Sequence, residues 1–408
     1  MRSIKLQSVT EIVYSASVSQ QPIKPRNHLI DGLRGFALIS IMIVHASNHF
    51  MYASQNSTNI LAFDLWDEIG SYLVYILFIG KSSSLFALLF GVTYAIQLRN
   101  QEKKGLDFAG RFAWRLSLLM GFACFNAIFF PSGDILMTYA IVAFALIPVR
   151  HFSVKTLFVI SGLLFLQPQQ WFYEAMKVIS PDWQSPEWGW VREFSISFRG
   201  AQKEGTAAGI LWANVTEGQV VSILRLWLTG RSLQILGFFI LGFALQKSNM
   251  FDITDSRIAR IWKKILLVTV PITLCLFLYE FFPIWETTKI VNLVLSRWCA
   301  LSMSMMYCAL FYMVYRRSMA AGFCRPFEQY AQMSLSNYIG QSIFGMCLFA
   351  PFALNLGAHV GSMLSMVMAV FIVVVQIKLS QLWLQNHRYG PCEGLWHRLT
   401  WLKKAPKS

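Results

Sequence analysis

The sequence predicts an all-α integral membrane bundle of about ten transmembrane helices, with both ends in the cytoplasm. Hydrophobic residues make up 55% of the 408 residues and charged residues only 13%, whereas soluble chains carry roughly 25% charge. Apolar runs close to the roughly twenty residues that cross a bilayer recur along the whole chain. Most of this surface is therefore suited to lipid rather than water.

The expected elements follow from these runs in chain order. Residues 1–28 are expected to form a cytoplasmic tail, because polar residues interrupt every apolar stretch and leave no cleavable secretory signal. A first group of five spans should cover residues 29–166 and a second group of five residues 232–384, with a loop at 167–231 and a tail at 385–408. The expected spans are Leu29 to Phe50, Ser71 to Leu98, Phe112 to Phe130, Ile135 to Val149, Val154 to Leu166, Ser232 to Gln246, Ile261 to Phe282, Ile290 to Tyr315, Leu335 to Phe352 and Val360 to Leu384.

The distribution of charge predicts the orientation. Lys and Arg near span ends stay on the cytoplasmic side, and ten spans place the basic connections, such as Arg99 to Arg115, on one side. The loop from Tyr52 to Gly70 holds acidic residues and neither Lys nor Arg. We expect a multi-pass protein of a bacterial cytoplasmic (inner) membrane. The net charge of +15 is then explained by anionic lipid headgroups, and no nucleic acid is expected as a partner.

The long loop at 167–231 is expected to face outward. It is rich in tryptophan, including Trp171, Trp188 and Trp212. Such composition is typical of helices lying in the headgroup layer. The alternative is a lid or binding floor for an extracytoplasmic substrate.

Several classes of site receive no support from the sequence. The seven cysteines form no CxxC pairs, so neither a disulfide framework nor a metal site is expected. No Walker loop, GxGxxG fingerprint or internal repeat is found, and no tightly bound cofactor is expected.

Titratable residues lie on one face of the first span. At 100° per residue, Arg34 and His45 differ by about 20° in azimuth, and Asp31 and His45 by about 40°. Gly35 lies at the edge of this stripe, where a neighbouring helix or a ligand chain could approach closely. Ionisable groups inside a membrane are costly unless they face the bundle interior. The alternatives are an N-terminal cap for Asp31, an interface anchor for Arg34 and a structural hydrogen bond for His45.

Five motifs in this chain carry a family resemblance. The first span, KSSSLFALLFGVTYAIQLR (Lys81 to Arg99), GDILMTYA (Gly133 to Ala140), SLSNYIGQS (Ser334 to Ser342) and RYGPCEGLWHRLT (Arg388 to Thr400) resemble the YeiB-like membrane proteins, called domain of unknown function 418. Residues 335–400 hold the C-terminal motifs.

The resemblance extends to transmembrane acyltransferases that O-acetylate surface polysaccharides. In that group the first span carries D-G-L-R followed about three turns later by a catalytic His, which Asp31, Gly32, Leu33, Arg34 and His45 match. YeiB-like proteins usually have Asn at the position of His45. They also tend to carry a His where this chain has Asn126, which puts a catalytic role there in doubt, because an amide cannot accept a proton as imidazole does.

This resemblance implies a division of labour among the candidates. His45 would be the general base, since imidazole titrates near neutral pH. Arg34, with Arg111 and Arg115 at the cytoplasmic mouth, would hold the phosphates of coenzyme A. Asp31 would orient Arg34.

Other candidate binding residues have structural alternatives. Asp134 either caps the short fourth span or contacts an extracytoplasmic acceptor, and Arg297 either pairs inside the bundle or lines a site. Asn337 and Gln341 form a polar stripe on the ninth span, for interhelical hydrogen bonds or for ligand contact. Pro391, Glu393, Trp396 and Arg398 are expected to dock the tail on the cytoplasmic face.

Two function classes remain. The first is an acyltransferase that moves an acyl group from cytoplasmic acyl-CoA to a sugar or lipid hydroxyl near the outer face. The second is a secondary transporter of a small polar or anionic solute, for which we expect paired, Gly-interrupted half-helices and find none in the sequence. A non-catalytic scaffold is the remaining interpretation, and the oligomeric state is not predicted.

Overall fold

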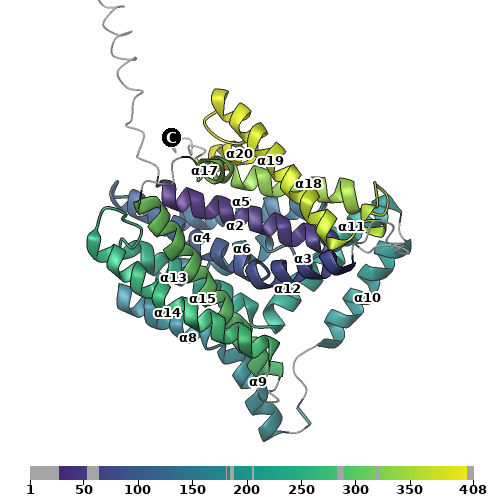
Figure 1. Ribbon diagram of the computed structural model, residues 1–408, viewed down its shortest axis with the longest axis horizontal. Coiled ribbons are helices and arrows are strands. Elements are labelled where there is room, and N and C mark those ends of the chain that lie inside the picture. The colour runs from purple at the N-terminus through teal and green to yellow at the C-terminus, as the bar shows by residue number, and fades with distance from the viewer. Residues whose placement is uncertain are drawn as a thin grey trace, which may run out of the picture.

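The computed structural model describes residues 27–52, 64–180, 182–183, 188–204, 206–282, 289–317, 322 and 324–401. Throughout these ranges the regular elements are helices, so the predicted all-α class is confirmed. Figure 1 shows α2 (His28–Ser47) crossing the molecule among the other long helices.

Length and apolar composition identify the spans. Within the described ranges, five helices are long and apolar enough to cross a membrane, or six when a bent pair is counted as one span. Long helices such as α14 (Ser256–Phe281) also expose large apolar side chains, with Leu267 66% exposed. This surface needs a lipid environment. The protein is a helical membrane bundle, and the count of ten spans stays a prediction.

Helix α2 forms the centre of the bundle. Its N-cap is Asn27, whose side chain accepts a hydrogen bond from the backbone N–H of Ile30, so the capping role considered for Asp31 is wrong. A Cβ at Gly35 would collide with the backbone carbonyl of Phe327 in α17 (Arg325–Gln332). The close helix approach expected at Gly35 is therefore present.

Two breaks at left-handed glycines separate consecutive helices, and the first lies inside a predicted span. The second expected span divides into α3 (Asp64–Leu77) and α4 (Lys81–Glu102), with Gly80 at φ +77° between them. Helices α12 (Gln219–Leu228) and α13 (Arg231–Lys247) meet at Gly230, which has φ +66°. The segments before and after Gly230 are bent by 74°. Among the described residues this is the one such helix pair bent by more than 40°, and the expected absence of paired, Gly-interrupted half-helices in corresponding halves of the chain stays a prediction.

The middle of the first half is built from short pieces. Helix α5 (Ala109–Ala127) is followed by α6 (Leu136–Ala143), α7 (Leu146–Val149) and α8 (Val154–Phe165). The fourth expected span is thus split between α6 and α7. The short α6 packs on α5. Asp134 lies in the segment directly before α6.

The basic connections meet at one end of the molecule, here called the basic end. Arg99 Nη1 donates to Asn249 Oδ1 (3.2 Å), which joins the last turn of α4 to the loop after α13. Arg150 Nη1 lies 3.0 Å from Asp107 Oδ1, and Lys247 Nζ donates to the carbonyl of Phe152 (2.8 Å). The connections expected on the cytoplasmic side are therefore neighbours in space.

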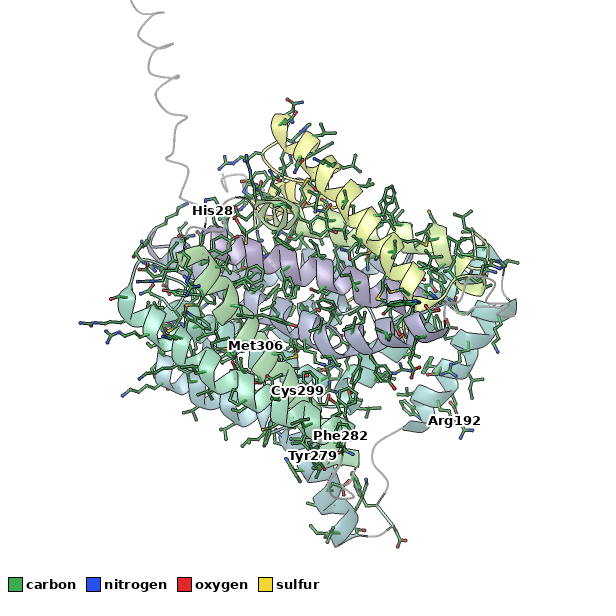
Figure 2. The ribbon with its side chains drawn as sticks, in the orientation of Figure 1. His28, Arg192, Tyr279, Phe282, Cys299 and Met306 are labelled. Atoms are coloured by element: carbon green, nitrogen blue, oxygen red, sulfur yellow. The ribbon has the colours of Figure 1, made fainter. Side chains whose placement is uncertain are left out.

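The loop at 167–231 forms a helical cap at the opposite end. Its helices are α9 (Pro168–Ile179), α10 (Trp188–Glu204), α11 (Ala207–Ala213), the π-helix η2 (Asn214–Gly218) and α12. Figures 1 and 2 show α9 and α10, with Arg192, at the end of the molecule away from His28. Trp190 and Trp212 are 59% and 71% exposed, and the interfacial position of this loop stays a prediction.

The second half completes the bundle. Helix α15 (Lys289–Arg316) packs along α14, while α18 (Ser334–Phe349) and α19 (Ser362–Asn386) contact α2. Single turns of 3-10 helix, η1 (His49–Met51) and η3 (Leu356–Ala358), lie near the ends of these helices. The last helix, α20 (Pro391–Thr400), packs on α5 and α18.

Candidate functional site

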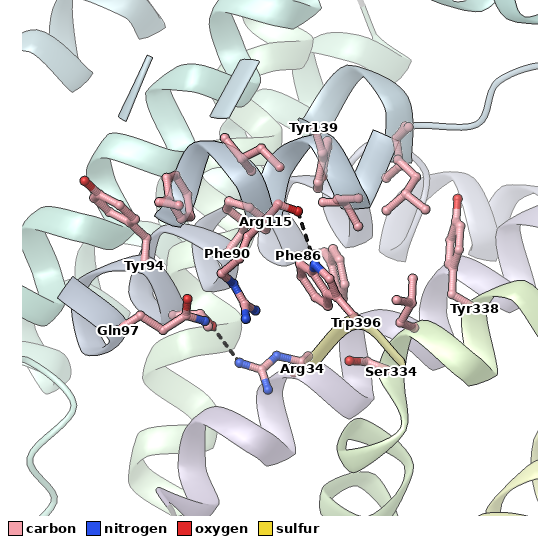
Figure 3. Close-up of a pocket in the computed structure, with 17 residues that line it drawn as sticks. Arg34, Phe86, Phe90, Tyr94, Gln97, Arg115, Tyr139, Ser334, Tyr338 and Trp396 are labelled. Carbon is pink, nitrogen blue, oxygen red and sulfur yellow. Dashed lines mark hydrogen bonds between the residues drawn. The ribbon is translucent and has the colours of Figure 1, made fainter. Parts of the chain in front are cut away.

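A cavity of about 190 Å³ lies inside the bundle between six helices. Its lining comes from α2, α4, α5, α18 and α20, and from α6 with the residue before it (Figure 3). Most lining side chains are aromatic or aliphatic, among them Phe86, Phe90, Leu116, Leu119 and Tyr139. Apolar cavities of about 150 Å³ can accept benzene, so this space suits a short apolar chain.

Arg34 places a cation in the wall of this cavity. Its Nη2 donates to Thr93 Oγ1 on α4 (2.7 Å), and its Nη1 lies 3.3 Å from Asp31 Oδ1 one helical turn earlier. The side chain is 21% exposed. This geometry fits the expected role of Asp31 in orienting Arg34, because an i,i+3 spacing brings the two side chains together.

Arg115 supplies a second cation at the same end of the cavity. Figure 3 shows the guanidinium groups of Arg34 and Arg115 near one another, with Tyr338 farther along the cavity. The Arg115 guanidinium carbon lies 4.3 Å from the ring centre of Trp396, which also lines the cavity. Arg111 is exposed, stacks on Trp401 at 4.2 Å and is not part of the cavity lining.

Helix α20 closes the basic end of the cavity, as expected for a docked tail. Glu393 Oε1 accepts hydrogen bonds from the backbone N–H groups of Leu335 (2.6 Å) and Ser336 (3.0 Å). An anion at the start of α18 is favourable, because helix N-termini carry partial positive charge. Trp396 Nε1 also donates to the carbonyl of Arg115 (3.1 Å).

Helix α20 also contributes a histidine, His397, which adds no charge to the basic end of the cavity near neutral pH. Burial, reinforced by the nearby Arg115 and Arg388 guanidinium groups, lowers the pKa of His397 below its usual value. A lowered pKa keeps imidazole neutral at pH values where an ordinary histidine begins to charge. The positive potential of the mouth therefore comes from the arginines.

Polar groups gather at the far end of the cavity around Asp134. Its carboxylate accepts hydrogen bonds from the Tyr338 hydroxyl (2.7 Å), Asn126 Nδ2 (3.1 Å) and the backbone N–H of Leu136 (3.0 Å). Asp134 is 1% exposed. The N-cap position of α6 is Ile135, so the predicted N-cap at Asp134 is wrong, although its carboxylate accepts a hydrogen bond from the first N–H of that helix. The bond to Asn126 joins two of the candidate residues. Tyr338 connects this group to the cavity, which it lines.

His45 lies next to this group but does not line the cavity. Its ring centre is 4.6 Å from that of Phe130 and 6.4 Å from that of Tyr338. The Nε2 atom is buried and has no hydrogen-bond partner among the residues that the structure describes. A buried imidazole nitrogen without a partner remains available to exchange a proton with a ligand.

Asn337 and Gln341 lie apart from the cavity in an interhelical network. Asn337 Nδ2 donates to the carbonyl of Tyr330 (3.0 Å) and to Ser380 Oγ (3.1 Å). Gln341 Nε2 donates to the Tyr330 hydroxyl (2.8 Å) and to the carbonyl of Leu38 (3.3 Å). These bonds join α18 to α2, α17 and α19 and correspond to the structural alternative.

Arg297 lies in a different cavity, together with Lys81 and Arg231. Sequence reasoning selected Arg297 but neither of the other two. Lys81 and Arg231 each follow a left-handed glycine and precede a serine. This repeated Gly-cation-Ser pattern is the sequence signal from which Lys81 and Arg231 could have been selected. Thr93, Tyr338 and Trp396 were also missed as cavity residues.

Comparisons with known proteins show which family this chain is similar to. Residues 245–403 match the family model described as "Protein of unknown function (DUF418)". The uncharacterized protein YxaH of Bacillus subtilis is 26% identical over 397 residues, which cover 93% of this chain and 95% of that protein. The uncharacterized protein YeiB of Escherichia coli is 24% identical over 409 residues, covering 93% of this chain and 98% of that protein.

A third relative matches a shorter region. The uncharacterized 39.9 kDa protein in the amylase 3' region of Bacillus acidopullulyticus is 27% identical over 104 residues, or 26% of this chain. The two longer matches extend over nearly the whole bundle, and the family model covers its C-terminal part. The chain therefore resembles the YeiB-like membrane proteins over nearly its whole length, and its C-terminal part matches the DUF418 family model.

Proposed function

We propose that this protein is a membrane-bound acyltransferase that takes an acyl group from acyl-CoA and transfers it to a sugar or lipid hydroxyl. The observation that supports this most is the cavity with two guanidinium groups at one end and an apolar body beyond them. Guanidinium groups bind phosphates in bidentate pairs. Arg34 and Arg115 would hold phosphates of the donor, and the aromatic walls would enclose its acyl chain.

His45 would act as the general base in this reaction. Its Nε2 would take the proton from the acceptor hydroxyl, whose oxygen attacks the thioester carbonyl carbon. The carbon–sulfur bond then breaks, and the proton passes from Nε2 to the departing thiolate. The acceptor would approach His45 from the end covered by α11 and α12, where the Asp134 segment lies.

One purified-protein assay tests the proposal. Proteoliposomes containing the protein receive acetyl-CoA labelled in the acetyl group, together with a membrane-lipid extract as acceptor. The proposal expects labelled ester in the lipid or sugar fraction and an equal amount of free coenzyme A thiol. Thioester that stays intact with every acceptor offered would contradict it.

A secondary transporter of an anionic solute is the second candidate function. It is favoured by the two helix breaks at Gly80 and Gly230, each followed by a cation at the first helical position. Interrupted helices whose N-termini face an anion are typical of transporter binding sites. The same proteoliposomes separate the two functions, because a transporter moves an intact solute across the bilayer and leaves the thioester unbroken.

A further inference from the structure

A second cavity, of about 100 Å³, contains three cationic side chains. Lys81 is the first residue of α4, Arg231 is the first residue of α13, and Arg297 lies on α15. Glu280 of α14 also lines the cavity and accepts a hydrogen bond from the Tyr75 hydroxyl. With three cations and one carboxylate, the charged side chains of the described lining sum to +2.

Two of these cations donate to neutral partners. Lys81 is 5% exposed, and its Nζ donates to the carbonyl of Tyr75 (2.7 Å). Arg231 Nη2 donates to Ser83 Oγ (2.5 Å). Neutral acceptors solvate a cation without cancelling its charge. Like charges held together inside a membrane protein are costly unless an anion joins them.

Arg297 carries the strongest sign of a missing ligand. The residue is 9% exposed and lines the cavity. Its Nε is buried and has no hydrogen-bond partner in the described part of the chain. Buried guanidinium donors are nearly always satisfied, so this group is poised for an acceptor that enters the cavity.

Two helix N-termini reinforce the positive charge. Helices α4 and α13 each begin after a left-handed glycine, and neither has a side-chain cap. The N–H groups of Lys81 and Ser82 at the start of α4 donate to the carbonyl of Phe78 (3.0 Å each), so the contribution of this end is the helix dipole, which favours an anion. Gly80 also lies close to the neighbouring cation, because a Cβ built there would be 3.6 Å from Arg231 Nη1.

We propose that this cavity binds an oxyanion, the phosphate or carboxylate group of a ligand. Two guanidinium forks and one ammonium group suit the several oxygens of such a group. Tyr75, Ile79 and Glu280 line the cavity and are exposed, so the ligand can enter between α3 and α14. Cys299 also lines this cavity and is labelled in Figure 2, near Tyr279 and Phe282 at the end of α14.

This anion site is separate from the larger cavity but adjacent to it. Ser83 accepts the bond from Arg231, and its backbone carbonyl accepts a hydrogen bond from the hydroxyl of Tyr139, which lines the larger cavity. The anion site does not depend on acyl transfer. Its test therefore uses binding and stability rather than turnover.

The test measures thermal unfolding of the full chain in an uncharged detergent at constant ionic strength. Inorganic phosphate and a short-chain phosphatidic acid are titrated separately, against wild type, Arg297→Gln, Arg297→Lys and the exposed control Arg192→Gln. At least one probe should raise the unfolding temperature of wild type and of Arg192→Gln. Arg297→Gln should weaken the affinity of the protein for that probe by about tenfold or more, as expected for a lost charge-assisted hydrogen bond. Arg297→Lys should weaken the affinity by less.

The ligand-free proteins supply an independent readout. Arg297→Gln removes one of three like charges, so its unfolding temperature without ligand should be at or above that of wild type. A response to phosphate alone assigns a small soluble anion, and a response to phosphatidic acid assigns a lipid headgroup. The proposal is overturned if neither probe shifts wild type, or if Arg297→Gln binds as tightly as wild type. A lower unfolding temperature for ligand-free Arg297→Gln, with unchanged probe affinity, would make the cluster structural.

Discussion

At the scale of single residues, the environment of His45 determines what a substitution does. Its Nε2 has no partner in the described structure, so removing that atom strands no hydrogen-bonding group. The ring still packs against Phe130 and Phe50. Chemistry and packing at His45 can therefore be separated by choosing a substitution of similar shape.

His45→Asn provides that separation. The asparagine keeps much of the volume but cannot accept a proton as imidazole does. We expect acyl transfer to fall by roughly 10²- to 10⁴-fold, as for a lost acid–base group, while expression and the unfolding temperature stay close to wild type. Initial rates at saturating acyl-CoA check this, and full activity in a well-folded His45→Asn protein would remove the catalytic assignment.

At the scale of helices, glycines fix how α4 and α13 cross. A Cβ at Gly91 would collide with the backbone carbonyl of Phe239, and one at Gly242 with that of Leu88. The contacts are reciprocal, so each helix lies directly against the backbone of the other. Small residues give such close approach in membrane bundles, and this crossing holds Lys81 and Arg231 at the same end.

Alanine substitutions test this crossing, because the expected change in the free energy of unfolding has opposite signs at the crossing and at a control position. Gly242→Ala should lower the free energy of unfolding by about 1–3 kcal/mol, because the added methyl meets backbone that cannot rotate away. Gly121→Ala on α5 has open space around the added carbon and should raise stability by up to about 1 kcal/mol through helix propensity. Denaturation in mixed micelles measures both, and equal effects at the two positions would contradict the crossing.

The sequence predicted the helices better than their breaks. Apolar runs indicate which segments lie in lipid, but a glycine inside such a run has two meanings. Gly80 and Gly230 adopt left-handed conformations and start new helices, whereas Gly91 and Gly242 remain helical and admit a neighbour. The tertiary contacts that distinguish these cases are not visible in a single sequence.

The same limit explains which parts of the site were predicted. Asp31 and Arg34 lie on one helix, so helical periodicity was enough to pair them. Lys81, Arg231 and Arg297 come from three helices far apart in the chain. Their meeting depends on how those helices pack, and the sequence alone could not bring them together.

At the scale of the whole molecule, charge and aromatic residues mark two different ends. The basic connections contact one another at the end where α2 begins, and the Trp-rich helices lie at the other end (Figure 1). Arg34 and Arg115 line the larger cavity on the side of the basic end. His45 lies toward the end with the Trp-rich helices. This polarity is what transfer of a group from one side of a membrane to the other requires.

Topology reporters test the polarity directly. A reporter fused after Lys407 and another inserted between Asn100 and Leu106 should read as cytoplasmic, because Lys and Arg are retained on that side. A reporter near Trp188 should read as outside. A cytoplasmic signal near Trp188 would contradict the ten-span arrangement and the placement of the acceptor.

Binding of a non-transferable thioether analogue of acetyl-CoA tests most directly whether the larger cavity is the proposed acyl-CoA site. Equilibrium binding to purified wild type, Arg34→Lys and Arg111→Lys should give saturable affinity that falls only in Arg34→Lys. Arg34 lines the cavity and its planar fork is lost in lysine, whereas Arg111 stacks on Trp401 outside it. Identical affinities for all three proteins, or no saturable binding to wild type, would contradict the claim.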